Sequence, residues 1–518
     1  MDDRVAGALR LLPGYAAEHV VLSMTALALG VAISLPLAIV ASRRPRLRFA
    51  ALAIASLMQT IPGLALLALF YPLLLALSAF TTRQFGFAVP ALGFLPSLLA
   101  LTIYSMLPIL RNGVTALAGV DATYLEAADG VGMTPRQRLF RVELPLAAPV
   151  IMAGIRTAAV WTIGIATLST AVGQTSLGNF IFAGLQTENW VYVLTGCIAV
   201  VILALAVDQV LGLIESGAVR RDGRRIAIGL AALILGTATA AAALLRGPGA
   251  DYVVGAKNFS EQYILAGLMA GRIEATGHSA ARKEGLGSAV IFRALAGNDI
   301  DAYVDYSGTL WTNVLERRDV PPREALLAEL TRLMRERYGV TVLGALGFQN
   351  AYALAMRRDR AATLGVRTIA DLVPLAPQLT LGSDLEFLSR PEWTALRNAY
   401  RLEFGQEKSF NPTFMYRALE DGLVDVISAF SSDGRLAGDR LVVLEDAKHA
   451  IPAYDAVILI APKRADDQVL REALTPLIDA IPVETMRQAN FMLDRDTDKA
   501  SLADAVRFLS AGLSAPKK

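Results

Sequence analysis

The sequence has almost none of the residues that build disulfides and metal clusters. Its one cysteine, Cys197, lies in an apolar run, which excludes an intramolecular disulfide and a cysteine-based metal cluster. The three histidines, His19, His278 and His449, lack the spacing of metal ligands, so we expect no metal site. A net charge of +2 provides none of the basic surplus that nucleic acid requires. We therefore expect neither a metal nor a nucleic-acid partner.

Catalytic and nucleotide-binding motifs are also missing from the 518 residues. No Gly-x-x-x-x-Gly-Lys-Ser/Thr occurs, so the chain is not expected to bind ATP as a P-loop protein does. Neither a nucleophile elbow nor a pair of carboxylates in a supporting context is found. These absences predict a chain that is not an enzyme, has no catalytic residues and binds no cofactor of its own.

Apolar residues are abundant. They make up 54% of the chain against 19% charged residues, and the mean hydropathy of +0.46 is typical of a membrane protein. About six apolar runs reach the roughly 20 residues that cross a bilayer. They lie at approximately His19–Ala41, Ala51–Leu77, Ala91–Leu110, Pro149–Val172, Trp190–Ile214 and Ile226–Leu245. The first lacks a cleavage site followed by a soluble domain, so we interpret it as a retained span.

Arginine clusters orient these runs in the membrane. The clusters are Arg43, Arg44, Arg46 and Arg48 after the first run, Arg136, Arg138 and Arg141 before the fourth, and Arg220, Arg221, Arg224 and Arg225 before the last. If the runs alternate in direction, all three clusters fall on one side, which the positive-inside rule makes cytoplasmic. The chain from Arg246 onward is then extracytoplasmic, on a multi-pass protein of the cell (inner) membrane.

The character of the sequence changes near Arg246-Gly247-Pro248-Gly249, which we take as a domain boundary. It separates a membrane domain at 1–225 and a last membrane anchor with its linker at 226–250 from a soluble domain at 251–518. Strands are predicted in this domain at 252–256, 301–306, 340–344, 351–356, 378–382, 424–430, 441–444 and 456–461. Helical segments alternate with them, which is the pattern of an α/β fold.

A spaced motif lies between the third and fourth apolar runs. Glu126-Ala127-Ala128 is followed after three residues by Gly132 and after nine more by Val142-Glu143-Leu144-Pro145. Strong helix formers, a glycine that frees the turn and a terminating proline predict two short helices joined by a turn. The spacing resembles the cytoplasmic coupling loop of ABC-importer permeases. The resemblance implies a separate ATPase subunit that docks on this loop, with the motif positions Glu126, Ala127, Ala128, Gly132, Leu144 and Pro145.

Some polar positions inside the predicted spans have two interpretations each. Pro62-Gly63 interrupts the second run, which predicts either a gate or hinge or a tolerated packing kink. Arg156 and Asp208 are costly in lipid. We interpret both as side chains that snorkel from near the ends of their spans, with a role in a translocation path as the alternative.

The soluble half carries a second resemblance, on three tracts. These are Gly255-Ala256-Lys257-Asn258-Phe259-Ser260-Glu261-Gln262, Asp305-Tyr306-Ser307-Gly308-Thr309 and Ser431-Ser432-Asp433-Gly434-Arg435. They resemble the substrate-binding proteins of the glycine betaine/carnitine/choline ABC importers (Opu or ProX type, including ergothioneine importers), and the membrane half resembles the permease of the same family. The resemblance implies an α-helical type I ABC importer permease, with about six transmembrane helices, fused to a two-lobed α/β periplasmic-binding-protein domain. One lobe is expected at about 251–345 and 452–518, the other at about 346–451.

The family resemblance also implies the site residues. A trimethylammonium group has a diffuse positive charge and no hydrogen-bond donor, so the faces of aromatic rings recognise it. The matching cage positions are Tyr306, Tyr352, Phe430 and Tyr454. Phe430 departs from the family's tyrosine, which leaves the exact substrate open. Gln262 and Thr309 match positions that contact the ligand's carboxylate or hydroxyl. Arg390 lies in a loop resembling one that borders the cleft, although a surface salt bridge explains an arginine there equally well.

The two resemblances together imply the permease and substrate-binding subunit of an ABC importer for quaternary ammonium compounds such as glycine betaine, choline and carnitine. An ergothioneine importer of the same family stays open, because ergothioneine has the same cationic head. Two other classes also stay open: an osmosensor that binds the ligand without transport, and an enzyme on a two-lobed α/β fold. One chain supplies half a pathway, which implies a homodimer that recruits two ATPase subunits and leaves ATP to them.

Overall fold

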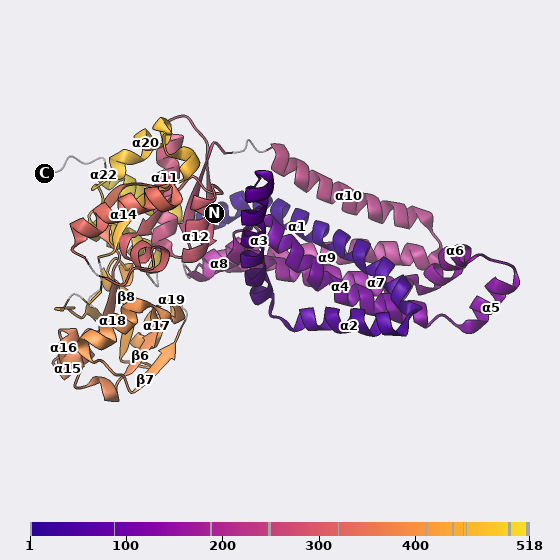
Figure 1. Cartoon of the computed structure of the whole chain (residues 1–518), viewed down its shortest axis with the longest axis horizontal. Coiled ribbons are helices and arrows are strands. Elements are labelled where there is room, and N and C mark those ends of the chain that lie inside the picture. Colours follow the sequence, from indigo (N-terminus) through magenta and orange to yellow (C-terminus); the bar gives the residue numbers. More distant parts are fainter. Residues whose placement is uncertain are drawn as a thin grey trace. The chain divides into compact units, whose positions relative to one another are not determined.

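The computed structural model describes residues 3–513 except 88, 187–188, 247–249, 320, 411, 438–439, 449, 452 and 496–498. The chain divides into two compact units, Met1–Phe182 with Val191–Gly249 and Ala183–Trp190 with Ala250–Lys518 (Figure 1). The first unit is helical and the second contains the strands. The expected boundary at Gly247-Pro248-Gly249, like His449, lies outside the described residues.

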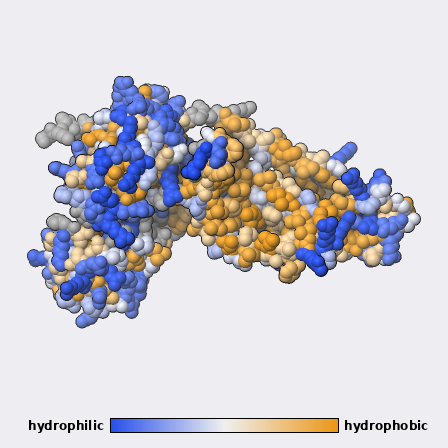
Figure 2. Space-filling view, in the orientation of Figure 1, coloured by the Kyte–Doolittle hydropathy of each residue, from blue (hydrophilic) through white to orange (hydrophobic). Residues whose placement is uncertain are grey.

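Six helical segments in the described chain are long and apolar enough to cross a membrane, as predicted. They are Val5–Ser42, Gly63–Phe85, Phe94–Ala118, Pro135–Val172, Trp190–Arg220 and Gly223–Leu245. The corresponding helices are α1 (Asp3–Ser42), α3 (Gly63–Phe85), α4 (Phe94–Ala118), α7 (Leu144–Ala166, with shorter turns on both sides), α9 (Trp190–Arg220) and α10 (Gly223–Arg246). On the face that Figure 2 shows, apolar residues cover most of the length of this unit and polar residues gather at one end, whereas the α/β unit is largely polar. An apolar surface of this extent suits contact with lipid.

The predicted second span, Ala51–Leu77, is wrong as a single helix. The chain instead forms α2 (Pro45–Thr60) and α3, which run in different directions in Figure 1. Between them Ile61 is extended, with φ −72° and ψ 123°, because the ring of Pro62 disfavours a helical conformation at the residue before it. The proline therefore ends one helix and allows the next to start in a new direction.

The structure pairs Arg156 with Asp208, an arrangement that neither interpretation of these two residues included. An Arg156 guanidinium nitrogen lies 2.7 Å from Asp208 Oδ2, and another lies 2.8 Å from Glu215 Oε2. Arg156 is on α7 and both carboxylates are on α9. Charges that pair with each other between two membrane helices avoid the cost of isolated charges in lipid.

Two five-stranded sheets form the second unit. The first has the order β2-β1-β3-β10-β4, and its strands are β1 (Tyr252–Lys257), β2 (Ala280–Leu286), β3 (Ala302–Tyr306), β4 (Thr341–Gln349) and β10 (Asp455–Ile460). The second has the order β7-β6-β8-β5-β9, with β5 (Tyr352–Arg357), β6 (Thr380–Ser383), β7 (Gln406–Ser409), β8 (Val426–Phe430) and β9 (Leu441–Val443). The chain passes between the sheets at Asn350-Ala351 and again between Val443 and Asp455.

Helices cover both sheets. The longer ones are α11 (Ser260–Glu274), α12 (Ser288–Ala296), α14 (Arg323–Tyr338), α18 (Pro391–Tyr400), α19 (Pro412–Glu420), α21 (Val483–Asp494) and α22 (Leu502–Leu513). Shorter ones are α13 (Ser307–Thr309), α15 (Arg358–Leu364), α16 (Ile369–Leu372), α17 (Leu385–Ser389) and α20 (Gln468–Leu474). A buried cluster of side chains that includes Ile264, Leu354 and Ile458 spans both sheets. Two sheets joined by two crossovers form two lobes, and the functional side chains described below lie where the lobes meet.

Candidate ligand-binding site

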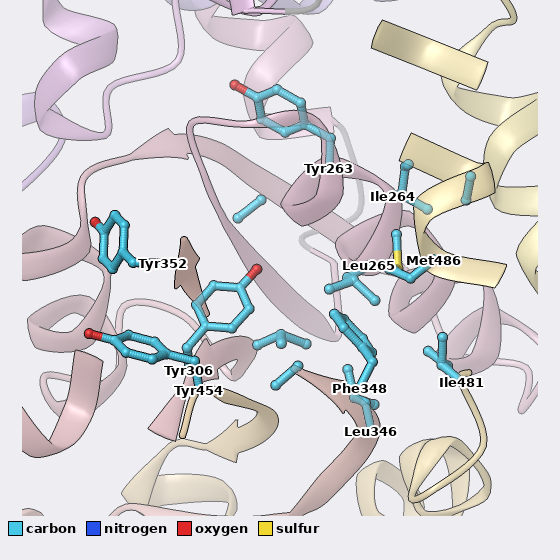
Figure 3. Packing of buried hydrophobic residues seen from close by; sticks show 14 of the residues in the cluster. Tyr263, Ile264, Leu265, Tyr306, Leu346, Phe348, Tyr352, Tyr454, Ile481 and Met486 are labelled. Carbon is cyan, nitrogen blue, oxygen red and sulfur yellow. The ribbon is translucent and has the colours of Figure 1, made fainter. Parts of the chain in front are cut away.

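A cavity of about 600 Å³ lies between the two sheets of the α/β unit. The side chains on its wall include the four aromatic residues expected to form a cage, Tyr306, Tyr352, Phe430 and Tyr454. Figure 3 shows Tyr306, Tyr352 and Tyr454 on one side of the hydrophobic side chains Leu346, Phe348 and Ile481. The three tyrosines thus form the boundary between the hydrophobic core and the cavity.

Strand pairing brings two of these rings together. Tyr352 on β5 lies opposite Phe430 on β8 in the antiparallel register, and directly opposed side chains share one face of a sheet. Their ring centroids are 4.8 Å apart, and the Tyr454 ring lies 5.8 Å from that of Tyr352 at an interplanar angle of 89°. Differently oriented ring faces around one space are the geometry that encloses a cation.

Gly308 explains how Tyr454 fits against the chain that follows β3. A Cβ atom at position 308 would lie 2.6 Å from the ring of Tyr454, which is closer than van der Waals contact allows. The glycine in the Tyr306-Ser307-Gly308-Thr309 tract is therefore required by the close approach of this ring. Any other residue there would displace Tyr454.

Buried carboxylates hold two of the tyrosine hydroxyls. Tyr306 donates to Glu261 Oε1 at 2.6 Å, and Tyr454 donates to Glu392 Oε1. Burial raises the pKa of both hydroxyls well above the usual range, so both stay neutral donors at physiological pH. These hydrogen bonds fix the orientation of the rings without using their faces.

The three residues predicted to contact the polar part of the ligand, Gln262, Thr309 and Arg390, do not all face the cavity. Thr309 and Arg390 lie on the cavity wall. Gln262 lies behind Tyr306, where its side-chain nitrogen donates to Val304 O and to the Tyr306 hydroxyl, both at 3.0 Å. Gln262 is therefore placed to support a cage ring and not to face the cavity. The Arg390 guanidinium lies 5.3 Å from the centre of the Tyr352 ring.

Sequence reasoning missed several residues on the cavity wall. The ring of Phe259 lies 6.2 Å from that of Tyr306 and 6.5 Å from that of Phe430, so it adds a fifth aromatic residue. Glu261 and Asn490 also line the cavity. Phe259 and Glu261 lie in the tract that carries the family resemblance, so their position in that tract could have identified them as site residues. Asn490 comes from α21, and nothing in its sequence context indicates a site.

Further charged side chains line the cavity. Arg435 forms an ion pair with Asp433 at 3.0 Å and lies 3.7 Å from the centre of the Tyr416 ring. Asp494 accepts a hydrogen bond from Ser260 Oγ at 2.5 Å, and burial raises the pKa of its carboxyl to about 6. The cavity wall thus combines aromatic rings with charged side chains. No group of three or more His, Cys, Asp or Glu side chains in the described chain is arranged to hold a metal ion.

The spaced motif of the helical unit forms α5 (Ala122–Gly130), α6 (Pro135–Arg138) and a π-helical turn (Leu139–Glu143). Gly132 has φ +76°, a left-handed conformation that glycine adopts without strain, and it forms the turn between α5 and α6. Glu126 and Ala127 are exposed and Ala128 is buried. Exposed apolar side chains of Tyr124, Val131 and Phe140 lie beside them in the chain, which leaves this segment a surface for a partner.

An ion-pair network connects this segment to the end of α1. Glu143 is buried and pairs with Arg43 at 3.1 Å and with Arg138 at 3.0 Å, and Arg138 also pairs with Asp129 at 2.8 Å. Networks that share a buried carboxylate position their members more firmly than isolated surface pairs do. Movement of the loop is therefore mechanically connected to α1.

Two family models match this chain. One, described as the substrate binding domain of an ABC-type glycine betaine transport system, matches residues 250–510. The other, described as a binding-protein-dependent transport system inner membrane component, matches residues 30–220. The two matches fall on the two units of the structure.

Curated relatives and solved structures show similarity to each part. The ergothioneine transport permease/ergothioneine binding protein of Helicobacter pylori (strain G27) is 28% identical over 462 residues, covering 86% of this chain and 80% of the relative. The choline transport system permease protein of Bacillus subtilis (strain 168) is 42% identical over 198 residues, covering 38% of this chain and 84% of the relative. A crystal structure of a glycine betaine/carnitine/choline ABC transporter covers 50% of this chain and 98% of its own, at 24% identity and a TM-score of 0.45.

Proposed function

This chain belongs to the glycine betaine, choline, carnitine and ergothioneine family of ABC importers, as a permease fused to its substrate-binding domain, and we propose that its aromatic cage binds the quaternary ammonium group of the transported ligand. It is a multi-pass membrane protein and a non-catalytic component, and the ATP is bound by a separate ATPase subunit. The observation that carries the proposal is the convergence of Tyr306, Tyr352, Phe430 and Tyr454 on one cavity.

Cation–π attraction explains why such a cage suits this ligand. Each ring face contributes on the order of 1 kcal/mol to the binding of a cation, and more where the contact excludes water. The cage tyrosines are at most 6% exposed, so a ligand that contacts their rings is shielded from bulk water. A trimethylammonium group needs no hydrogen-bond acceptor, and the cage offers it ring faces on several sides.

We assign the remaining predicted contacts to the polar part of the ligand. Thr309 and Arg390 reach the cavity and can bind a carboxylate or a hydroxyl. Gln262 contributes through Tyr306, whose hydroxyl it contacts at 3.0 Å. In this assignment the cage sets the affinity for the head group, and the polar residues discriminate among ligands that share it.

The osmoprotectants glycine betaine, choline and carnitine are the first candidates for the ligand, because the family model that matches residues 250–510 is described by glycine betaine transport and the permease relatives by transport of choline, glycine betaine and carnitine. Ergothioneine is the second. It is favoured by a relative, described as both permease and binding protein, that is similar over 86% of this chain. A cavity of about 600 Å³ with charged side chains on its wall also leaves room for the imidazole-thione ring that ergothioneine carries beyond its head.

We propose that transport proceeds through a homodimer. The binding domain is extracytoplasmic, its lobes close on the ligand, and the loaded domain delivers the ligand to the permease. On the other side of the membrane, two ATPase subunits hold the loops that contain Glu126, Ala127, Ala128, Gly132, Leu144 and Pro145. An osmosensor that transports nothing has no need of such a loop, and its presence therefore favours an importer.

Calorimetric titration of the full chain in nanodiscs tests the ligand assignment. Glycine betaine, choline, carnitine and ergothioneine are titrated in parallel into the wild type and into Tyr352→Leu, which keeps apolar bulk but removes a ring face. We expect one or more of the four to bind the wild type and to bind the variant at least tenfold more weakly. Failure of all four contradicts the quaternary ammonium assignment. Ligand-stimulated ATP hydrolysis after addition of the ATPase subunit distinguishes an importer from a sensor.

A further inference from the structure

Charged side chains surround the cage, and most of them form pairs. Lys257 is buried, forms an ion pair with Asp305 and places its ammonium 5.2 Å from the centre of the Tyr306 ring. Arg390, which lies over a neighbouring cage ring, is 3.6 Å from Glu392. In each pair the positive charge next to a ring is compensated by a carboxylate, so neither pair adds net charge to the site.

Glu261 differs from these pairs. It is 3% exposed and lines the cavity. Its Oε1 accepts hydrogen bonds from the Tyr306 hydroxyl at 2.6 Å and from Asn350 at 3.0 Å, and its Oε2 accepts one from Asn490 at 2.9 Å. All three partners are neutral donors, and no lysine, arginine or histidine of the described residues forms an ion pair with it. Three converging donors stabilise an ionised carboxylate.

Among the described carboxylates that bond to a cage hydroxyl or pair with a cation beside a cage ring, Glu261 is therefore the one without a cationic partner. A buried carboxylate without a cationic partner is costly, and a cation that enters the adjacent cavity removes that cost. We propose that Glu261 determines specificity: its carboxylate supplies the negative charge that the cationic head of the ligand neutralises, so that the site selects a cation over a neutral molecule of the same shape. This inference rests on the proposed function.

A dependence on pH follows. Burial raises the pKa of Glu261, and its hydrogen bonds oppose that shift. A bound cation favours the carboxylate, so affinity falls as pH falls through the pKa of Glu261 in the free protein, and binding at a pH near that pKa releases protons. The groups on the elements around Glu261 are Tyr306, Asn350, Ser432 and Asn490, with the charged residues Lys257, Asp305, Asp433, Arg435 and Asp494 beyond them.

The test compares a cation with its neutral isostere. Choline and 3,3-dimethylbutan-1-ol, in which carbon replaces the charged nitrogen, are titrated into the full chain in nanodiscs as wild type and as Glu261→Gln. Glutamine keeps the size of the side chain and an oxygen that accepts from Tyr306 and Asn350. We expect the variant to bind choline on the order of tenfold more weakly, because it lacks the negative charge that attracts the cationic head, and to bind the alcohol as the wild type does. Glu274→Gln makes the same change at an exposed position of α11 and should leave both affinities unchanged.

The possible results separate this inference from the proposed function. An equal loss for choline and for the alcohol indicates a structural role for Glu261 and overturns the inference, as does no loss for choline. If the wild type binds no quaternary ammonium compound, the proposed function fails and the inference fails with it. Should Glu261→Gln not fold, a pH series on the wild type decides: the affinity for choline must fall with pH and that for the alcohol must not, and a parallel response of the two overturns the inference.

Discussion

Phe430 is the cage residue whose chemistry differs from the family pattern. Its ring is 4.8 Å from that of Tyr352, and it lies at the end of β8 at the edge of the cavity. The missing hydroxyl does not change the ring face, which is the part that attracts a cation. Without the hydroxyl, this position has no hydrogen-bond donor for the ligand. We expect that loss to affect how the polar part of the ligand is held.

We expect Phe430→Leu to weaken choline binding about 3- to 10-fold, because leucine keeps apolar contact but has no π face. Phe430→Tyr restores the family residue and should bind choline within about twofold of the wild type, since the ring face is kept. Titration of the full chain with choline and with its neutral isostere measures both effects. An unchanged affinity in the leucine variant contradicts a role for Phe430 in the cage.

Asp494 makes stability depend on pH. Its ordinary pKa of 3.8 is raised to about 6 in the folded domain, chiefly because it is buried. The folded state therefore binds the proton more tightly than the unfolded state, and the associated stability is present below about pH 4 and is lost as pH rises to about 6.

Asp494→Asn should consequently raise the melting midpoint of the binding domain by a few degrees at pH 7.5 and hardly at all at pH 4, since asparagine stays neutral at both. Differential scanning fluorimetry of the full chain at the two pH values measures this difference. Asp466→Asn is the matched control, with the same change at an exposed position. Equal shifts for Asp494→Asn at both pH values contradict the explanation.

At the scale of elements, Pro108 in α4 and the helix break before Pro62 each leave a backbone carbonyl without a helical donor. The side chains of Gln59 and Tyr104 donate to these two carbonyls. Pro108 in α4 cannot donate to the carbonyl of Tyr104, and the Gln59 side chain donates to that carbonyl at 3.2 Å. In return the Tyr104 hydroxyl donates to the carbonyl of Ile61, in the break before Pro62. The break between α2 and α3 is thereby connected to α4, which favours a defined hinge over a loose kink.

Removal of either hydrogen bond should destabilise the helical unit. We expect Gln59→Leu and Tyr104→Phe each to cost about 1–2 kcal/mol, because a carbonyl in the membrane interior then lacks a donor. Thermal unfolding in nanodiscs measures the loss, and ligand affinity should not change. Thr60→Val is the control, since the Thr60 hydroxyl is exposed and bonds within its own helix, to Leu57 O. Wild-type stability in both variants contradicts this role.

The whole molecule consists of two compact units with separate cores. A ligand that binds one unit stabilises that unit by mass action, and the other unit gains nothing unless the two unfold together. We therefore propose that the membrane domain and the substrate-binding domain unfold independently.

Choline at about 100 times its Kd should stabilise the binding domain by about 2.7 kcal/mol. For a domain of this size the midpoint should rise by roughly 5–10 °C, while the transition of the helical unit stays in place. Scanning calorimetry with and without choline shows both transitions, and Tyr352→Leu should lose most of the shift. A single transition that moves as a whole contradicts independent unfolding.

The number of membrane spans and the family of both halves follow from the sequence alone, because length, hydropathy and motif spacing are local properties of the chain. Strands with apolar sequences, such as β3, β5 and β10, were predicted for the same reason. β2 was not, since its sequence Ala280–Leu286 is rich in charge and its pairing with β1 comes from distant residues. The break at Pro62 could be located, but the directions of α2 and α3 could not.

The cage positions were predicted residue by residue from the family pattern, but their surroundings required the tertiary structure. Glu261 and Gln262 are adjacent in α11, and the sequence does not say which of them faces the cavity. The structure places Glu261 on the wall and Gln262 behind Tyr306. Asn490, which donates to Glu261, is 229 residues away in the chain. Composition and motifs determine which chemical groups are available, whereas the packing of distant elements decides which of them meet and which charge remains without a partner.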